Sequence, residues 1–98
     1  MSTITMPPAL AGRELRYLLT VLLHQVGRPL TVTEMIALVE RDGLRVAGRP
    51  SKTVSDAPRW EIGKGRVVKV GRSTYRRGTM PRSTAWWIRQ HLRDRGLL

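Results

Sequence analysis

An apolar repeat near the N-terminus is the feature that most constrains how this chain can fold. Apolar side chains recur at i, i+3, i+4, i+7, i+8 and i+11, the spacing of one helix face, at Leu15, Leu18, Leu19, Leu22, Leu23 and Val26. Gly27 and Pro29 mark the end of this helix, and Pro7 or Pro8 suits its first turn. The repeat therefore predicts an α-helix with one buried face and with His24 exposed to solvent on the other.

The composition is that of one small folded domain. The chain has 98 residues, of which 41% are hydrophobic and 26% are charged, which suffices for one hydrophobic core and not for two. It has no cysteine and only two well-separated histidines, so we expect no disulfide, no metal and no cofactor. The first residues lack the pattern of a signal peptide, and no apolar stretch approaches the ~20 residues of a membrane span. We therefore expect a cytoplasmic protein without a membrane partner.

Positive charge is concentrated in the second half of the chain. The formal net charge is +11, and the residues after Gly48 contain 13 basic side chains against three acidic ones. Such asymmetry is typical of a domain with one side facing a polyanion, with nucleic acid the leading candidate. The alternative is a surface whose charge serves only solubility. We expect the cationic side chains after Gly48 to converge on one surface.

Capping and stop signals predict a second helix. Thr31 to Glu34 match the capping box, in which the Thr31 hydroxyl and the Glu34 carboxylate each bind a free backbone N–H. The helix should begin at Val32, end at Gly43 and direct Met35, Ile36 and Val39 inward. Residues 30–32 just before it favour a very short edge strand.

A third helix is expected between Ser51, a suitable N-cap, and the glycines at 63 and 65. Its inward side would carry Val54, Ala57, Pro58 and Ile62. Its outward side would carry Lys52, Ser55, Asp56 and Arg59. Pro58 cannot donate a backbone hydrogen bond, so it predicts a kink, or a break with Asp56 capping a new turn.

A β-hairpin and a last helix follow. Residues 66–70 and 73–76 flank a turn at Gly71 and Arg72, and their alternation predicts strands with Val68, Val70 and Tyr75 inward. Lys69 and Arg76 would then point outward, with Arg72 at the tip. The last helix should run from about Ser83 to Arg95 and bury Ala85, Ile88 and Leu92.

This order of elements predicts an α+β, mainly α, fold of the winged-helix type. It would comprise an N-terminal tail (1–10), a winged-helix domain (11–78) with a three-helix helix-turn-helix core and a two-stranded β-wing, and a C-terminal helix (79–98) that packs on the domain or forms a subunit interface. In this fold the third helix fits the major groove and the wing lies along an adjacent backbone or minor groove. We therefore expect binding to duplex DNA, by a small transcriptional regulator or a nucleoid-associated protein.

The entry to the second helix and the hairpin resemble those of the HARE-type helix-turn-helix domain. Arg28 to Ile36 is similar to the R-P-L-T-x-x-E-I entry of that family, and Val68 to Tyr75 to its V-G-x-G-x-Y wing. The resemblance covers about residues 12–78, with Ser73 at a position where the family usually has glycine. It implies a winged-helix module of DNA-binding and chromatin-related proteins, with Leu30 and Ile36 in the core and Tyr75 packing the wing.

The expected DNA contacts are the side chains that project from the third helix, its two ends and the hairpin. They are Arg49, Lys52, Thr53, Ser55, Arg59, Lys64, Lys69, Arg72 and Arg76. Base readout is assigned to Ser55 and Arg59, with Lys52 or Thr53 as further candidates, because phosphate contacts carry no sequence information. For Asp56 we favour a surface ion pair with Lys52 over acceptance from cytosine N4.

The outer side of the last helix carries Trp86 beside Arg89 and Arg93. Two interpretations stay open: a cation–π cluster that covers the ring, and an interface that forms a homodimer. Trp87 is expected to pack with His91, and Trp60 beside the hairpin. The alternative to DNA binding is a winged-helix protein-interaction module that uses this helix.

Other functional classes find little support in the sequence. It contains no nucleophile elbow, phosphate loop, metal-ligand spacing or carboxylate pair, so we expect no enzyme and no small-molecule ligand. An RNA-binding role would favour aromatic side chains on an exposed basic sheet, and only Tyr75, which we assign inward, lies in the hairpin.

Overall fold

The structure is a computed structural model, which describes residues 9–98. Its elements in chain order are β1 (Ala9–Leu10), α1 (Gly12–Val26), β2 (Leu30–Thr31), α2 (Val32–Arg41), β3 (Arg45–Val46), α3 (Pro50–Asp56), α4 (Arg59–Gly63), β4 (Val67–Gly71), β5 (Thr74–Arg77) and α5 (Arg82–Asp94). The expectation about a helix start at Pro7 or Pro8 falls outside the described residues. Residues 9 and 10, expected in the tail, form β1, which pairs in parallel with β3.

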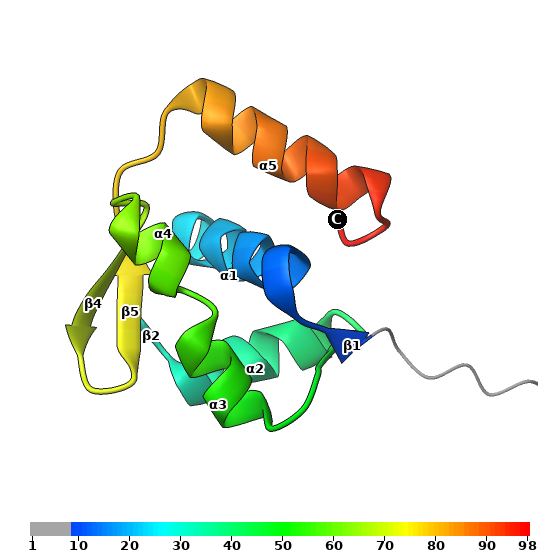
Figure 1. The fold of residues 1–98 in the computed structure, drawn as a ribbon, viewed down its shortest axis with the longest axis vertical. Helices are drawn as coiled ribbons and strands as arrows, with labels where there is room; N and C mark the ends of the chain where they lie inside the picture. The colour runs from blue at the N-terminus through cyan, green and yellow to red at the C-terminus, as the bar shows by residue number, and fades with distance from the viewer. Residues whose placement is uncertain (1–8) are drawn as a thin grey trace, which may run out of the picture.

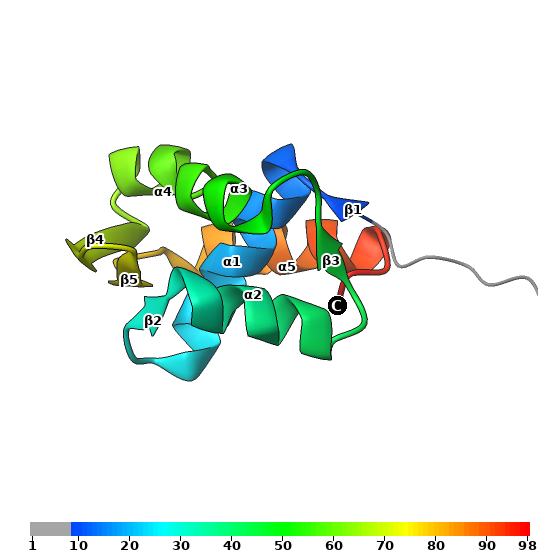
Figure 2. The same ribbon diagram turned by 90° about the horizontal axis from the view of Figure 1, so that it is seen from below.

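Helix α1 lies at the centre of the molecule. Helix α5 covers one side of it, and α2 and α3 lie side by side on the other, with the β4–β5 hairpin at one end (Figure 1). Figure 2, seen from the side of α2 and α3, shows α5 behind α1. The residues after Gly48 are therefore divided between two opposite sides of α1 and one of its ends.

The apolar repeat of α1 forms the core as predicted, except at its last member. Leu15, Leu18, Leu19, Leu22 and Leu23 are buried, whereas Val26 is exposed in the final turn. Gly27, at φ 72°, ends the helix in the left-handed conformation that glycine adopts without strain. The prediction that His24 is exposed to solvent is wrong, because the residue is half-buried. Its Nε2 donates to the Arg66 carbonyl oxygen, at a distance of 3.1 Å.

The predicted capping box of α2 is present in full. The Thr31 hydroxyl accepts from the Glu34 N–H at 3.1 Å, and the Glu34 carboxylate accepts from the Thr31 N–H at 3.0 Å. This backbone hydrogen bond, together with the Arg28 guanidinium, lowers the pKa of Glu34. The capped turn follows directly on β2, the edge strand that pairs Leu30 with Tyr75 of β5.

Pro58 breaks the expected third helix into α3 and α4. The helix begins two residues earlier than predicted, because Pro50 occupies its first turn and Arg49, not Ser51, is the N-cap. Helix α4 starts after Pro58 without a side-chain cap, so Asp56 does not cap a new turn. Val54 and Pro58 are buried as expected, but Ile62 is exposed.

The inner face of β4 is one residue out of phase with the prediction, whereas in β5 Tyr75 points inward and Arg76 outward as predicted. Tyr75 is buried and pairs with Lys69, so Lys69 lies on the same face as Tyr75. Strand alternation places Val67, which is buried, on that face too, whereas Val70 is 47% exposed. A register irregularity between Lys69 and Gly71 accompanies the tight turn.

Gly78, directly after the hairpin, packs against residues 65 and 66, directly before it. The Gly78 N–H donates to the Arg66 carbonyl at 2.8 Å, and a Cβ at position 78 would overlap the Gly65 carbonyl oxygen. We therefore expect Gly78→Ala to lower the free energy of unfolding by about 1–3 kcal/mol, because the backbone must move. Urea denaturation measures this, with Gly63→Ala as control: Gly63 has open space around it in α4 and should tolerate alanine. Equal effects of both changes would contradict the proposed packing at Gly78.

These observations establish an α+β domain in which an antiparallel hairpin follows the first four helices. Helix α5 begins at Arg82, one residue before the expected start, and buries Ile88 and Leu92 against α1. None of the helices within residues 9–98 combines the length and apolar character required to cross a membrane.

Candidate nucleic-acid interface

A groove of about 340 Å³ separates the α3–α4 segment from the hairpin. One wall is formed by α3 and α4, and the other by the two strands and their turn. Its lining includes four of the predicted DNA-binding residues, which are Ser55, Arg59, Lys69 and Arg72. The two segments expected to contact DNA therefore face one open space, although the sequence separates them by several residues.

Tyr75 connects the two walls of this groove. Its buried ring belongs to the hairpin, and its hydroxyl donates to the backbone carbonyl of Ser55 in α3 at 3.4 Å. At the tip of the hairpin, Ser73 has φ 55°, a left-handed conformation that favours glycine. The geometry thus fixes the spacing of Ser55 from the hairpin and explains why a glycine would suit position 73.

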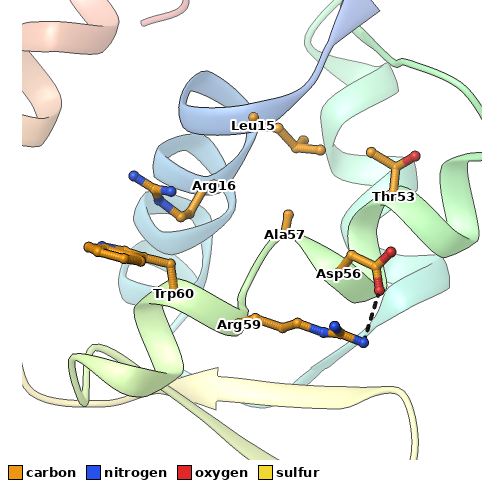
Figure 3. Close-up of a pocket in the computed structure, with 8 residues that line it drawn as sticks. Leu15, Arg16, Thr53, Asp56, Ala57, Arg59 and Trp60 are labelled. Atoms are coloured by element: carbon orange, nitrogen blue, oxygen red, sulfur yellow. Dashed lines mark ion pairs between the residues drawn. The ribbon is translucent and has the colours of Figure 1, made fainter.

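Asp56 holds two cations at the rim of the groove. Its carboxylate lies 3.1 Å from Lys52 Nζ and 3.4 Å from Arg59 Nη2, the latter drawn as a dashed line in Figure 3. The favoured ion pair of Lys52 with Asp56 is thus present. The side chain of Arg59 is 81% exposed. Because exposed pairs contribute about 0–1 kcal/mol, Arg59 can exchange Asp56 for a phosphate or a base edge at little cost.

Other predicted contacts lie away from this groove. The Thr53 hydroxyl donates to the Ala47 carbonyl at 2.9 Å and faces a second hollow, and Arg49 is exposed at the start of α3. Lys64 lies over the Trp60 ring, with its Nζ 5.2 Å from the ring centroid. Arg76 is on the opposite face of the hairpin from Lys69, in a hollow shared with Arg28 and Arg77.

Trp60 is exposed and packs against α1 instead of the hairpin. The Arg16 guanidinium lies 5.5 Å from the centroid of its ring. Both side chains border an open cleft of about 630 Å³, where Figure 3 shows Leu15 of α1 and Ala57 between α3 and α4. This cleft lies on the α1 side of the α3–α4 segment, and Arg59 lines both the cleft and the groove.

Glu61 is a buried acid that the sequence did not reveal as important. Its side chain is 0% exposed and pairs with two arginines, at 3.1 Å from Arg16 Nε and 3.1 Å from Arg66 Nε. Within residues 9–98 neither carboxylate oxygen has an aligned hydrogen bond, so charge attraction to the two guanidinium groups compensates its burial. This triad fastens α4 both to α1 and to the residue before β4, and thereby fixes the wall that carries Arg59.

Comparisons with family models, with curated proteins and with solved structures found no match. The interpretation of the groove therefore depends on the geometry and charge of the described residues.

The expectation of one cationic surface holds only in part. Cationic side chains of α4 and the hairpin line the groove. Arg66, however, forms an ion pair with Glu61. The arginines of α5 lie on the other side of α1 from α3. Arg95, after α5, pairs with Glu14 at 2.8 Å. The pKa of Glu14 is lowered by a hydrogen bond from its own backbone, and also by Arg95 and His91. The positive charge of the second half is thus spread over the groove, the opposite face of the hairpin and α5.

Proposed function

We propose that this chain binds duplex DNA, with α3 and the Arg59 turn directed at the major groove and the β4–β5 hairpin along the neighbouring backbone. The observation that carries the proposal is the common groove of Ser55, Arg59, Lys69 and Arg72. Arg and Lys side chains on a helix and an adjacent hairpin suit phosphate contact, and Arg also suits bidentate contact to guanine.

The arrangement of elements supports a winged-helix interpretation. Helix α2 packs against α3, and the hairpin follows directly after α4, as in a helix-turn-helix core with a wing. Membership of the HARE-type family is part of this proposal, supported by the capping box at Thr31, the buried Leu30 and the buried Tyr75. The role we propose is that of a small transcriptional regulator or a nucleoid-associated protein.

The first test compares nucleic acids. Fluorescence anisotropy of labelled duplex DNA, single-stranded DNA and structured RNA of equal length should show preference for the duplex at physiological salt. The double variant Lys69→Ala and Arg72→Ala should weaken duplex binding, whereas Arg41→Ala, an exposed arginine at the end of α2, should not. Equal affinity for all three nucleic acids would contradict the proposed docking of α3 in a major groove.

A second test separates base readout from phosphate contact. After selection of bound fragments from random duplex DNA, we expect Arg59→Ala to abolish preference at one base step, at a cost of about 1–3 kcal/mol. Arg72→Ala should weaken all sequences uniformly, because the hairpin tip contacts phosphate. A uniform loss with both variants would show that Arg59 also serves only as a phosphate contact.

A further inference from the structure

Helix α5 presents a second surface, on the side of α1 opposite to α2 and α3 (Figure 1). Arg82, Trp86, Arg89 and Arg93 are spaced by four, three and four residues, so they follow one face of the helix. We call these four residues the Arg–Trp stripe. Ile88 and Leu92, by contrast, are fully buried in the core. The stripe therefore lies on the outer face of α5, while the inner face of the helix packs in the core.

The Trp86 side chain is 64% exposed, more than any other large hydrophobic side chain described within residues 9–98. Its neighbour Trp87 is engaged differently, because its ring stacks on His91 at 5.7 Å and meets Tyr17 edge-on at 5.8 Å. No cation–π contact of Trp86 is found among residues 9–98, so the arginines beside it do not cover the ring. The structure thus favours an interface over the self-covered cluster.

The arginines of the stripe lack acidic partners among residues 9–98. Two arginines outside the stripe do have such partners: Arg95 pairs with Glu14, and Arg66 pairs with Glu61. The acidic residue of α5 itself, Asp94, accepts from Gln90 at 3.2 Å. The stripe consequently combines an uncovered indole ring with unneutralised positive charge. Its complement is a surface with carboxylates around an apolar side chain.

We propose that the Arg–Trp stripe docks a short acidic segment of a partner protein, with an apolar side chain against Trp86 and carboxylates on Arg82, Arg89 and Arg93. Exposed tryptophan and arginine are the side chains that most often dominate the binding energy of protein interfaces. This proposal is independent of DNA binding, and the position of the stripe leaves the groove free. A bound segment could therefore join a partner protein to a DNA-bound chain.

The size and charge of the stripe argue against a second copy of this chain as its occupant. Thirteen residues make α5 about 20 Å long, and a face about 10 Å wide falls well short of the about 800 Å² per partner of a stable interface. A symmetric pair of stripes would also bring arginines against arginines, which is repulsive. A short segment needs less area and supplies the opposite charge.

A membrane surface and DNA fit the stripe less well. The apolar residues Ile88 and Leu92 are buried against α1, so α5 has no broad apolar face to insert among lipids. Phosphate groups would satisfy the arginines but offer no apolar partner for the ring of Trp86. An acidic segment with an apolar side chain satisfies both.

The test is selection from a display library of random peptides, about 12 residues long, against the full chain. We expect enriched peptides to combine Asp or Glu with an aromatic or aliphatic residue, and to bind Trp86→Ala about 30-fold more weakly, the loss typical of a hot spot. Trp60→Ala removes an exposed tryptophan elsewhere and should leave their affinity unchanged. Arg93→Ala should weaken binding several-fold, while Arg72→Ala should not.

Four results would overturn the proposal. The first is an absence of peptides that depend on Trp86. The second is a dimer, measured by light scattering, that Trp86→Ala dissociates. The third is Trp86-dependent sedimentation with vesicles of equal parts phosphatidylcholine and phosphatidylserine. The fourth is a loss of duplex DNA affinity in Trp86→Ala. Failure of DNA binding by the wild type would leave this proposal intact, because the selection contains no DNA.

Discussion

Replacing Glu61 by glutamine should lower the free energy of unfolding by about 3 kcal/mol. The change keeps the size of the side chain but leaves the guanidinium groups of Arg16 and Arg66, which are 22% and 17% exposed, without their counter-charge. Breaking a buried pair from one side costs about 3–5 kcal/mol, and the partial exposure of both arginines favours the lower end. In urea this corresponds to a fall of roughly 2 M in the unfolding midpoint, a large share of the about 5–15 kcal/mol of a typical domain.

Asp56→Asn is the matched control for Glu61→Gln. Asp56 also pairs with two cations, but its side chain is 43% exposed, so its loss should change stability by less than about 1 kcal/mol. The triple change Arg16→Met, Glu61→Leu and Arg66→Met should recover most of the loss, because a buried triad can be exchanged for apolar residues without penalty. If Glu61→Gln and Asp56→Asn behave alike, the triad does not hold α4 in place.

Local signals in the sequence were sufficient to predict helix ends at which the free backbone groups are bound by residues close by in the chain. The capping box at Thr31 and the left-handed Gly27 depend on residues within one turn, and both are present. The stop at Pro58 follows from its missing N–H, but whether the helix kinks or breaks depends on what surrounds it. The order of helices and hairpin could therefore be predicted, and the shape of the α3–α4 turn could not.

The part of the site that escaped prediction depends on contacts between distant residues. Glu61 is a polar residue at an inward position, and its burial is compensated by Arg16, which lies 45 residues earlier in the chain. In the hairpin, the alternation of Arg66 to Val70 fits either face, and the inner one is decided by the pairing of Lys69 with Tyr75. This pairing turns Lys69 toward α4 and Arg76 away from it, which periodicity alone cannot decide.

Duplex DNA affinity should fall about 1,000-fold when the salt concentration rises from about 50 to about 200 mM. The predicted contact set would neutralise about five to seven phosphates, which gives a slope near −5 to −6 in a plot of log affinity against log salt. The groove contributes Lys69 and Arg72 to this number, and Lys52 lies at its rim. The other cations of the predicted set are Arg49, Lys64 and Arg76. Anisotropy titrations at several salt concentrations measure the slope directly.

Single variants should then change the slope by about one unit for each phosphate contact removed. Arg72→Ala is expected to do so, and Arg76→Ala separates two geometries, because Arg76 lies on the face of the hairpin turned away from Lys69. If Arg76→Ala leaves the slope unchanged, DNA contacts only the groove side of the hairpin. If Arg76→Ala makes the slope shallower, as Arg72→Ala does, phosphates contact both faces of the hairpin. A flat salt response of the wild type would contradict DNA binding altogether, since cations at a polyanion surface must displace its counterions.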